Sequence, residues 1–132
     1  MKIIIDCNVI ISAGLGSKVC INVLKKVVKN HRLFCSQEIF AEYIEVAKRK
    51  KFSQDFEKLK LILINIAEIA EFVKSTKKLE ISLSDQSDQI YLQAAVECNA
   101  NFFITGNIKH FPSGKYKNTQ ILSPADFLKK NK

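Results

Sequence analysis

Short apolar runs that alternate with longer amphipathic segments are the feature of this sequence that most constrains its fold. Strands of a parallel sheet are buried on both faces, so they read as nearly continuous apolar runs. Runs of this kind cover residues 2–5, 33–35, 72–73, 102–105 and 120–122. The alternation predicts an α/β fold of three layers, in which helices cover both faces of a central parallel sheet.

Candidate N-caps mark where the predicted helices begin, because a short polar side chain can accept a hydrogen bond from the first helical turn. These residues are Ser17, Ser36, Ser53, Asp85 and Ser123. Helices are expected over residues 18–29, 36–49, 53–70, 85–98 and 123–130, and a turn is expected over residues 12–17. A chain of 132 residues can bury one core but not two, so a single domain over residues 1–132 is expected.

The net charge and the cysteine content indicate which class of partner and which cellular compartment suit this chain. The net charge of +8 favours a polyanionic partner such as nucleic acid, although lysine-rich surfaces also serve solubility. The four cysteines lack the close pairing of a zinc site and are interpreted as reduced thiols. The N-terminus shows no signal-peptide pattern, and no apolar run approaches the roughly 20 residues that span a bilayer. A cytoplasmic location is therefore expected.

Asp6 interrupts an apolar stretch directly after the first predicted strand. In open parallel sheets, ligands bind beyond the carboxyl ends of the strands. A buried carboxylate needs a cation, hydrogen-bond donors or water, because burial without a partner costs several kcal/mol. Two interpretations stay open: Asp6 is a ligand for a cation, or it accepts hydrogen bonds from the backbone of the turn that follows.

Two further acids fall on the inner faces of predicted helices. Helical periodicity places Glu42 at the margin of the apolar stripe of the 36–49 helix, whereas Glu38 and Glu45 turn outward. It places Asp88 in the middle of the inner face of the 85–98 helix. The alternatives are a Glu42 whose carboxylate reaches solvent and an Asp88 that forms a capping box with Asp85.

Polar residues also follow the predicted strand 102–105. Gly106 and Asn107 suit a tight turn, and Thr105 and Asn107 add oxygen atoms to the same edge if this strand neighbours the first. Three inward acids on a basic protein favour Mg²⁺ or Mn²⁺, because these hard cations prefer oxygen ligands. A pair of such ions can hold the attacking water and the leaving oxygen in phosphodiester hydrolysis.

Four segments carry most of the polar residues discussed above: IIIDCNVIIS, SQEIFAEYIEV, LSDQSDQIYLQAAVECNANFFITGN and ILSPADFL. In their order along nearly the whole chain, they resemble PIN-domain ribonucleases, in particular the toxin component of prokaryotic toxin–antitoxin pairs. The resemblance implies a parallel sheet between helices and a metal-dependent endonuclease that cuts single-stranded RNA. It also implies a cognate antitoxin as partner and, often, a homodimer.

The resemblance assigns Asp6, Glu42 and Asp88 as the metal-binding acids. The family often has a fourth acid at the position of Asn107 in this chain. An Asn oxygen can coordinate a metal or orient a water, but it carries no charge, so the affinity for a second ion is lower. We therefore expect one tightly held Mg²⁺ or Mn²⁺, with a second ion arriving with the RNA phosphate.

Asn8 and Thr105 are expected to fix carboxylates or water through hydrogen bonds. An activated water would attack phosphorus in line and leave a 5′-phosphate and a 3′-hydroxyl. The basic residues expected to follow the RNA backbone are Lys48, Arg49, Lys50, Lys51 and Lys109. For the run 48–51, a solvated helix end is an equally good interpretation. His110 is interpreted as an incidental surface histidine, with a phosphate contact as the alternative.

Other functions stay open on the sequence alone. With Asn107 in place of an acid, the chain also fits a catalytically degenerate PIN-like protein that binds RNA or a partner. A phosphohydrolase with a covalent aspartyl intermediate would need a second acid where this chain has Asn8. No G-x-G-x-x-G follows the first strand, which argues against a dinucleotide-binding protein. The apolar 53–70 helix fits either a core position or a dimer surface.

Overall fold

The computed structural model describes residues 1–74, 76, 79 and 86–131. Within these residues, six strands form one sheet in the order β3-β2-β1-β4-β6-β5. The strands are β1 (Lys2–Ile5), β2 (Arg32–Ser36), β3 (Glu71–Val73), β4 (Phe102–Ile104), β5 (Lys115–Tyr116) and β6 (Thr119–Leu122). All neighbouring pairs are parallel except β5 and β6. The predicted α/β fold with a mostly parallel sheet is confirmed, and the short antiparallel strand β5 is an addition.

Strand order reverses at β1, which lies in the middle of the sheet. The chain runs from β1 outward through β2 to β3, and then returns to place β4 on the other side of β1. The three isoleucines of β1 are fully buried, as expected for a central strand covered on both faces. Asp6 follows directly at the carboxyl end of β1, at the point of reversal where open α/β sheets bind ligands.

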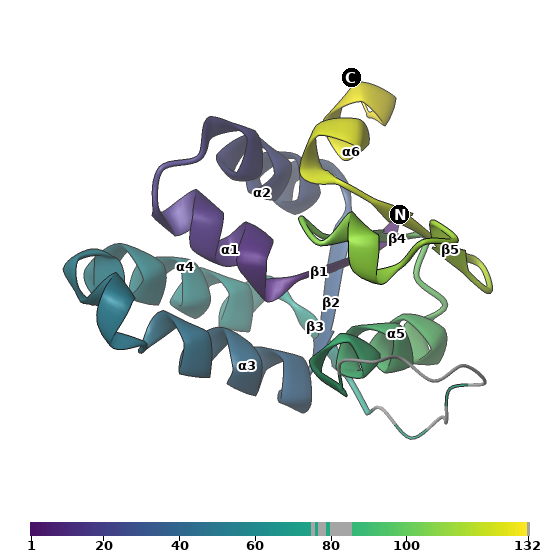
Figure 1. Ribbon diagram of the computed structural model, residues 1–132, viewed down its shortest axis with the longest axis horizontal. Coiled ribbons are helices and arrows are strands. Elements are labelled where there is room, and N and C mark those ends of the chain that lie inside the picture. Colours follow the sequence, from purple (N-terminus) through teal and green to yellow (C-terminus); the bar gives the residue numbers. More distant parts are fainter. Residues whose placement is uncertain (75, 77–78, 80–85, 132) are drawn as a thin grey trace.

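Helices cover both faces of this sheet. They are α1 (Cys7–Gly14), α2 (Lys18–Asn30), α3 (Gln37–Ala47), α4 (Phe56–Ile69), α5 (Gln86–Cys98) and α6 (Pro124–Lys130). Figure 1 shows α1 to α4 on one side of the sheet and α5 on the other, the arrangement that right-handed crossovers produce when strand order reverses. The predicted three layers are therefore present.

Three of the predicted N-caps are confirmed. The hydroxyl oxygens of Ser17, Ser36 and Ser123 accept hydrogen bonds from backbone N–H groups in the first turns of α2, α3 and α6, at 3.3, 3.2 and 3.1 Å. Ser53 does not cap a helix: it lies inside the 3₁₀ helix η1 (Lys50–Asp55), and α4 begins only at Phe56. Asp85, the remaining candidate cap, lies outside the described residues.

Helix α1 replaces part of the turn predicted over residues 12–17. Helix α1 is only eight residues long and ends in Gly14, so its second half has the small and polar residues that are typical of a turn. The chain turns only after α1, at Leu15 and Gly16, where Gly16 has a φ of 101°. Among the described residues no single helix is long and apolar enough to cross a membrane, and α1 and α2 reach that length only together, across a bend of 114°.

The apolar stripe predicted on α4 is part of the core. Leu59, Leu63 and Ile66 are at most 7% exposed. Leu61 and Ile64 on the same helix are exposed, at 63% and 46%. The stripe is therefore core, the first of the two sequence interpretations, and α4 also has a separate exposed apolar face.

Gly14, the last residue of α1, allows this helix to approach α4 closely. A Cβ atom added at Gly14 would lie 2.2 Å from Cδ2 of Leu59, whose side chain is only 1% exposed. We expect Gly14→Ala to lower the free energy of unfolding by about 1–3 kcal/mol through overpacking, despite the better helix propensity of alanine. Urea denaturation measures the change. In a Leu59→Ala background the cost of Gly14→Ala should shrink, and an unchanged cost would contradict the proposed contact.

Candidate functional site

A polar pocket of about 500 Å³ opens at the carboxyl edge of the sheet. The four candidate catalytic residues from the sequence, Asp6, Glu42, Asp88 and Asn107, all line it. They come from the end of β1, the middle of α3, the first turn of α5 and the loop after β4. Residues far apart in the sequence thus meet in one place, because each element ends at or passes the same edge of the sheet.

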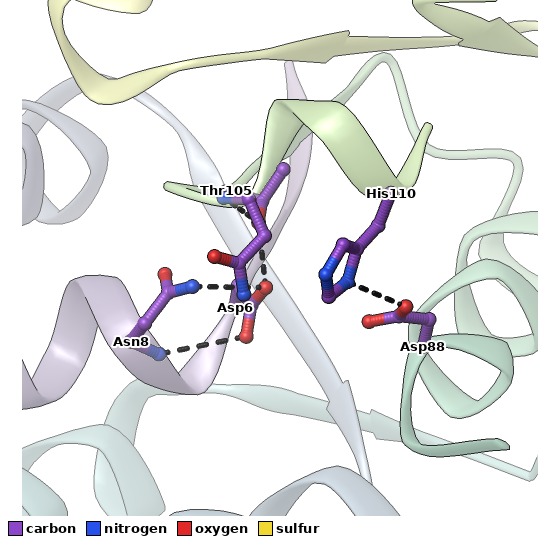
Figure 2. A network of polar contacts seen from close by, with 6 residues as sticks. Asp6, Asn8, Asp88, Thr105 and His110 are labelled. Carbon is purple, nitrogen blue, oxygen red and sulfur yellow. Dashed lines mark hydrogen bonds and ion pairs between the residues drawn. The ribbon is translucent and has the colours of Figure 1, made fainter. Parts of the chain in front are cut away.

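Asp6 is 5% exposed and is held by polar groups from two elements (Figure 2). The hydroxyl of Thr105 donates to its Oδ2 at 2.6 Å, and the Asn8 amide Nδ2 donates to the same oxygen at 3.5 Å. Asp6 is also the N-cap of α1, since its Oδ1 accepts from the Asn8 backbone N–H at 3.5 Å. The interpretation that Asp6 accepts a hydrogen bond from the backbone that follows it is therefore correct. The carboxylate can still have a second role as a ligand for a cation.

Burial raises the pKa of Asp6 above its ordinary value, and the nearby Asp88 carboxylate raises it further. The hydrogen bonds from Thr105 and Asn8 act in the opposite direction but do not offset the loss of solvation. The nearly buried Asp6 carboxylate, with Asp88 nearby, therefore lies in an environment that a cation would stabilise.

Asp88 is 6% exposed and lies on the inner face of α5, as helical periodicity predicts. Nδ1 of His110 is 2.8 Å from Asp88 Oδ2 (Figure 2). His110 belongs to the short 3₁₀ helix η2 (Ile108–His110), which follows β4, and its side chain is 43% exposed. It lines the pocket, so the interpretation as an incidental surface histidine misses its contact with Asp88. Its position three residues after Asn107 was the available sequence signal.

Glu42 is half-buried, whereas Glu38 and Glu45 are exposed, as periodicity predicts, but the exposed Glu45 also lines the pocket, which periodicity did not predict. The hydroxyl of Tyr91 donates a hydrogen bond to Glu42 Oε1. Tyr91 is 1% exposed and also lines the pocket. Tyr91 is not among the site residues predicted from the sequence, because an aromatic residue on the inner face of a helix gives no sign of a polar contact.

The loop after β4 is tied to the start of α1. The Asn107 backbone N–H donates to the Thr105 hydroxyl oxygen at 3.0 Å, and the Gly106 N–H donates to the Asn8 side-chain oxygen at 3.1 Å. Thr105 and Asn8 therefore connect Asp6 to the turn that presents Asn107. Both residues contact the carboxylate that the sequence assigned them to fix.

The donor chemistry of the pocket fits a hard divalent cation, since its acids supply oxygen atoms and its cysteine does not supply a thiolate. Burial, with the charges of Glu42 and Asp6, raises the pKa of the Cys7 thiol to about 12. Among the described residues, no three His, Cys, Asp or Glu side chains lie close enough together to form a metal site. Asp6, Glu42 and Asp88 thus share the pocket without forming a complete ligand cluster.

Basic side chains stand at the rim of the pocket. Arg49 and Lys51 line it, and the guanidinium of Arg49 is 3.3 Å from Glu45. Lys48, Lys50 and Lys109 are exposed and, in the described part of the chain, lie outside the lining. The structure therefore brings two of the five predicted RNA-contacting residues to the pocket.

A family model described as PIN domain matches residues 2–109. The chain belongs to the PIN domain family. The family predicted from the four sequence motifs is thereby confirmed. No curated protein sequence matches this PIN domain chain significantly.

Two solved structures resemble this PIN domain over almost its whole length. One is VapBC2 from Rickettsia felis bound to a DNA fragment from its promoter, with a TM-score of 0.65 and 23% identity, covering 93% of this chain and 98% of that one. The other is VapBC-1 from nontypeable Haemophilus influenzae, with a TM-score of 0.60 and 20% identity, covering 95% and 99%. At such identities the likeness supports the fold.

The raised pKa of Asp6 predicts how the metal-free fold responds to pH. The folded state binds the Asp6 proton more tightly than the unfolded state, so this contribution to stability is complete below the unfolded pKa and is lost as the pH rises through the folded pKa. Asp6→Asn should therefore raise the free energy of unfolding at pH 7, because Asn still caps a helix but carries no buried charge. The difference in the free energy of unfolding between Asp6→Asn and wild type should become smaller as the pH falls towards about 4.

Urea denaturation in the presence of a chelator, at pH 7, 5.5 and 4, measures this difference. Asp126→Asn, an exposed Asp in the first turn of α6, is the matched control and should not show the same pH-dependent gain. An Asp6→Asn variant less stable than wild type at pH 7 would contradict the argument.

Proposed function

We propose that this chain is a metal-dependent endoribonuclease that hydrolyses single-stranded RNA and acts, as one PIN-like domain, as the toxin of a toxin–antitoxin pair. The observation that supports it most is the placement of Asp6 and Asp88, both nearly buried, in one pocket with Arg49 and Lys51 at its rim. The buried carboxylates can bind a cation, and the basic side chains at the rim can bind the phosphate that this cation would contact.

Asp6 and Asp88 are the proposed direct ligands of Mg²⁺ or Mn²⁺, with Glu42 binding directly or through water. When bound, the ion would activate the attacking water and neutralise charge on the phosphate. Thr105 and Asn8 hold the Asp6 carboxylate in one orientation by hydrogen bonds. Asn107 offers an amide at the position of the family's frequent fourth acid and can orient a water, while the loss of one negative charge favours a single tightly held ion.

The proposed partner is an antitoxin protein, as the sequence resemblance implies. The two solved structures named above are VapBC assemblies. An apolar groove of about 320 Å³ between α2 and α4 offers a surface for it, lined by Leu24, Val28, Ile62 and Ile69 among others. Homodimerisation through the exposed residues Leu61 and Ile64 of α4, and a cytoplasmic location in line with four free, buried cysteines, belong to the same proposal.

Cleavage of a mixed-sequence single-stranded RNA by the purified protein tests the activity. We expect cutting with Mg²⁺ or Mn²⁺, no cutting with chelator, and products with a 5′-phosphate. Asp6→Asn and Asp88→Asn should each lower the rate by about 10²-fold or more, because each removes charge that acts on the transition state. Asp126→Asn should cleave like wild type.

Circular dichroism spectra of all variants establish that they are folded. A folded wild-type protein that binds RNA but does not cut it under any metal condition would contradict the nuclease. That result would favour the degenerate, RNA-binding interpretation, which the missing acid at Asn107 already allows.

The rim residues predict a salt-dependent contribution to RNA binding. Arg49→Gln with Lys51→Gln should weaken binding, and the slope of log affinity against log salt should fall by about 0.7 for each RNA phosphate that is no longer neutralised. Fluorescence anisotropy of a labelled RNA in chelator, where no cleavage is expected, measures both quantities. Lys29→Gln with Lys129→Gln removes the same charge from exposed positions on α2 and α6. Equal losses of affinity in both double variants would show that only net charge matters.

A further inference from the structure

The three acids of the candidate site come from three separate elements, and one buried side chain touches or adjoins all of them. Asp6 directly follows β1, Glu42 lies within α3, and Asp88 lies in the first turn of α5. Tyr91 follows Asp88 by three residues on the same helix, so the two side chains lie on one face. The Tyr91 hydroxyl contacts the other two elements, α3 and the end of β1.

The Tyr91 hydroxyl makes two hydrogen bonds of opposite direction. It donates to Oε1 of Glu42 and accepts from the backbone N–H of Cys7 at 3.0 Å. Cys7 is the residue directly after Asp6, so this bond fixes Tyr91 against the junction of β1 and α1. The hydroxyl therefore links α5 to α3 and to the end of β1 at a single atom.

Packing determines where this hydroxyl can lie. The Tyr91 ring stacks on Phe103 of β4, with centroids 5.2 Å apart and an interplanar angle of 17°. Tyr91 and Phe103 are 1% and 0% exposed. Burial and the neighbouring carboxylates raise the pKa of Tyr91 well above its ordinary value, so the hydroxyl keeps its proton and remains a donor.

We propose that Tyr91 is a positioning residue that holds the Glu42 carboxylate for metal binding, an inference that rests on the proposed function. A glutamate on a half-buried helix face has several rotamers, and a cation bound to it must select one. A hydrogen bond to one carboxylate oxygen from a packed ring makes that selection before the cation arrives. Loss of the hydroxyl should therefore weaken metal binding without removing any ligand.

The chain contains a matched control for this argument. Tyr43 is 0% exposed, and its hydroxyl donates to the backbone carbonyl oxygen of Ile5, one residue before Asp6. Tyr43→Phe thus removes a buried tyrosine hydroxyl from the same strand end, but a hydroxyl that holds backbone rather than a carboxylate. Tyr91→Phe and Tyr43→Phe are the same chemical change. A difference in Mn²⁺ affinity between them would therefore come from the lost hydrogen bond to Glu42.

Mn²⁺ titration followed by electron paramagnetic resonance of the free ion tests the proposal, with urea denaturation of every variant. Wild type, Tyr91→Phe, Tyr43→Phe, Glu42→Gln and the double variant Tyr91→Phe with Glu42→Gln are compared. Tyr91→Phe should weaken Mn²⁺ binding about tenfold or more, the size typical of losing a hydrogen bond to a ligand, while Tyr43→Phe should bind like wild type. In the Glu42→Gln background, Tyr91→Phe should add little, because the two changes act through one carboxylate.

Two results would overturn the proposal. One is a Tyr91→Phe variant that binds Mn²⁺ like wild type and differs only in stability, which would make Tyr91 a core residue alone. The other is a double variant in which the two reductions in affinity multiply, because Tyr91 would then act independently of Glu42. Wild-type protein that binds no Mn²⁺ would refute the proposed function itself and this inference with it, and is distinguishable from both.

Discussion

The burial of a carboxylate at the end of the central strand is the constraint on which the rest of the site depends. β1 contributes three fully buried isoleucines and ends in Asp6, whose own side chain is 5% exposed. The Asp6 backbone N–H still continues the sheet, donating to the carbonyl oxygen of Ile104 at 2.9 Å. The carboxylate thus follows the central, fully buried strand of the sheet, and the neighbouring elements must supply polar partners for it.

Those partners satisfy the carboxylate only in part. Thr105 and Asn8 donate hydrogen bonds to it, yet its pKa stays raised because burial outweighs them and Asp88 lies nearby. A site that stabilised this charge fully by itself would have less to gain from a cation. The incomplete compensation suits the metal-ligand role proposed for Asp6, and in that role the residue would lower the stability of the metal-free fold in exchange for function.

Local signals in the sequence predicted much of this arrangement. Serine caps and apolar periodicity are properties of a few adjacent residues, so α2, α3 and α6 and the inward faces of Glu42 and Asp88 could be read directly. Helix α1 was missed, because it is only eight residues long and its end at Gly14 has the residue types of a turn. The contacts of His110 with Asp88 and of Tyr91 with Glu42 join distant segments, and no local pattern encodes them.

The substitution at position 107 connects these observations. With Asn107 where the family resemblance leads us to expect an acid, the pocket holds one negative charge fewer than it would with a carboxylate at that position. Electrostatic attraction for a second cation is correspondingly weaker, whereas the basic rim of Arg49 and Lys51 favours a phosphate. Affinity for one ion must then come from geometry more than from charge. Hydrogen bonds that fix each carboxylate, from Thr105 to Asp6 and from Tyr91 to Glu42, become correspondingly more important in this chain.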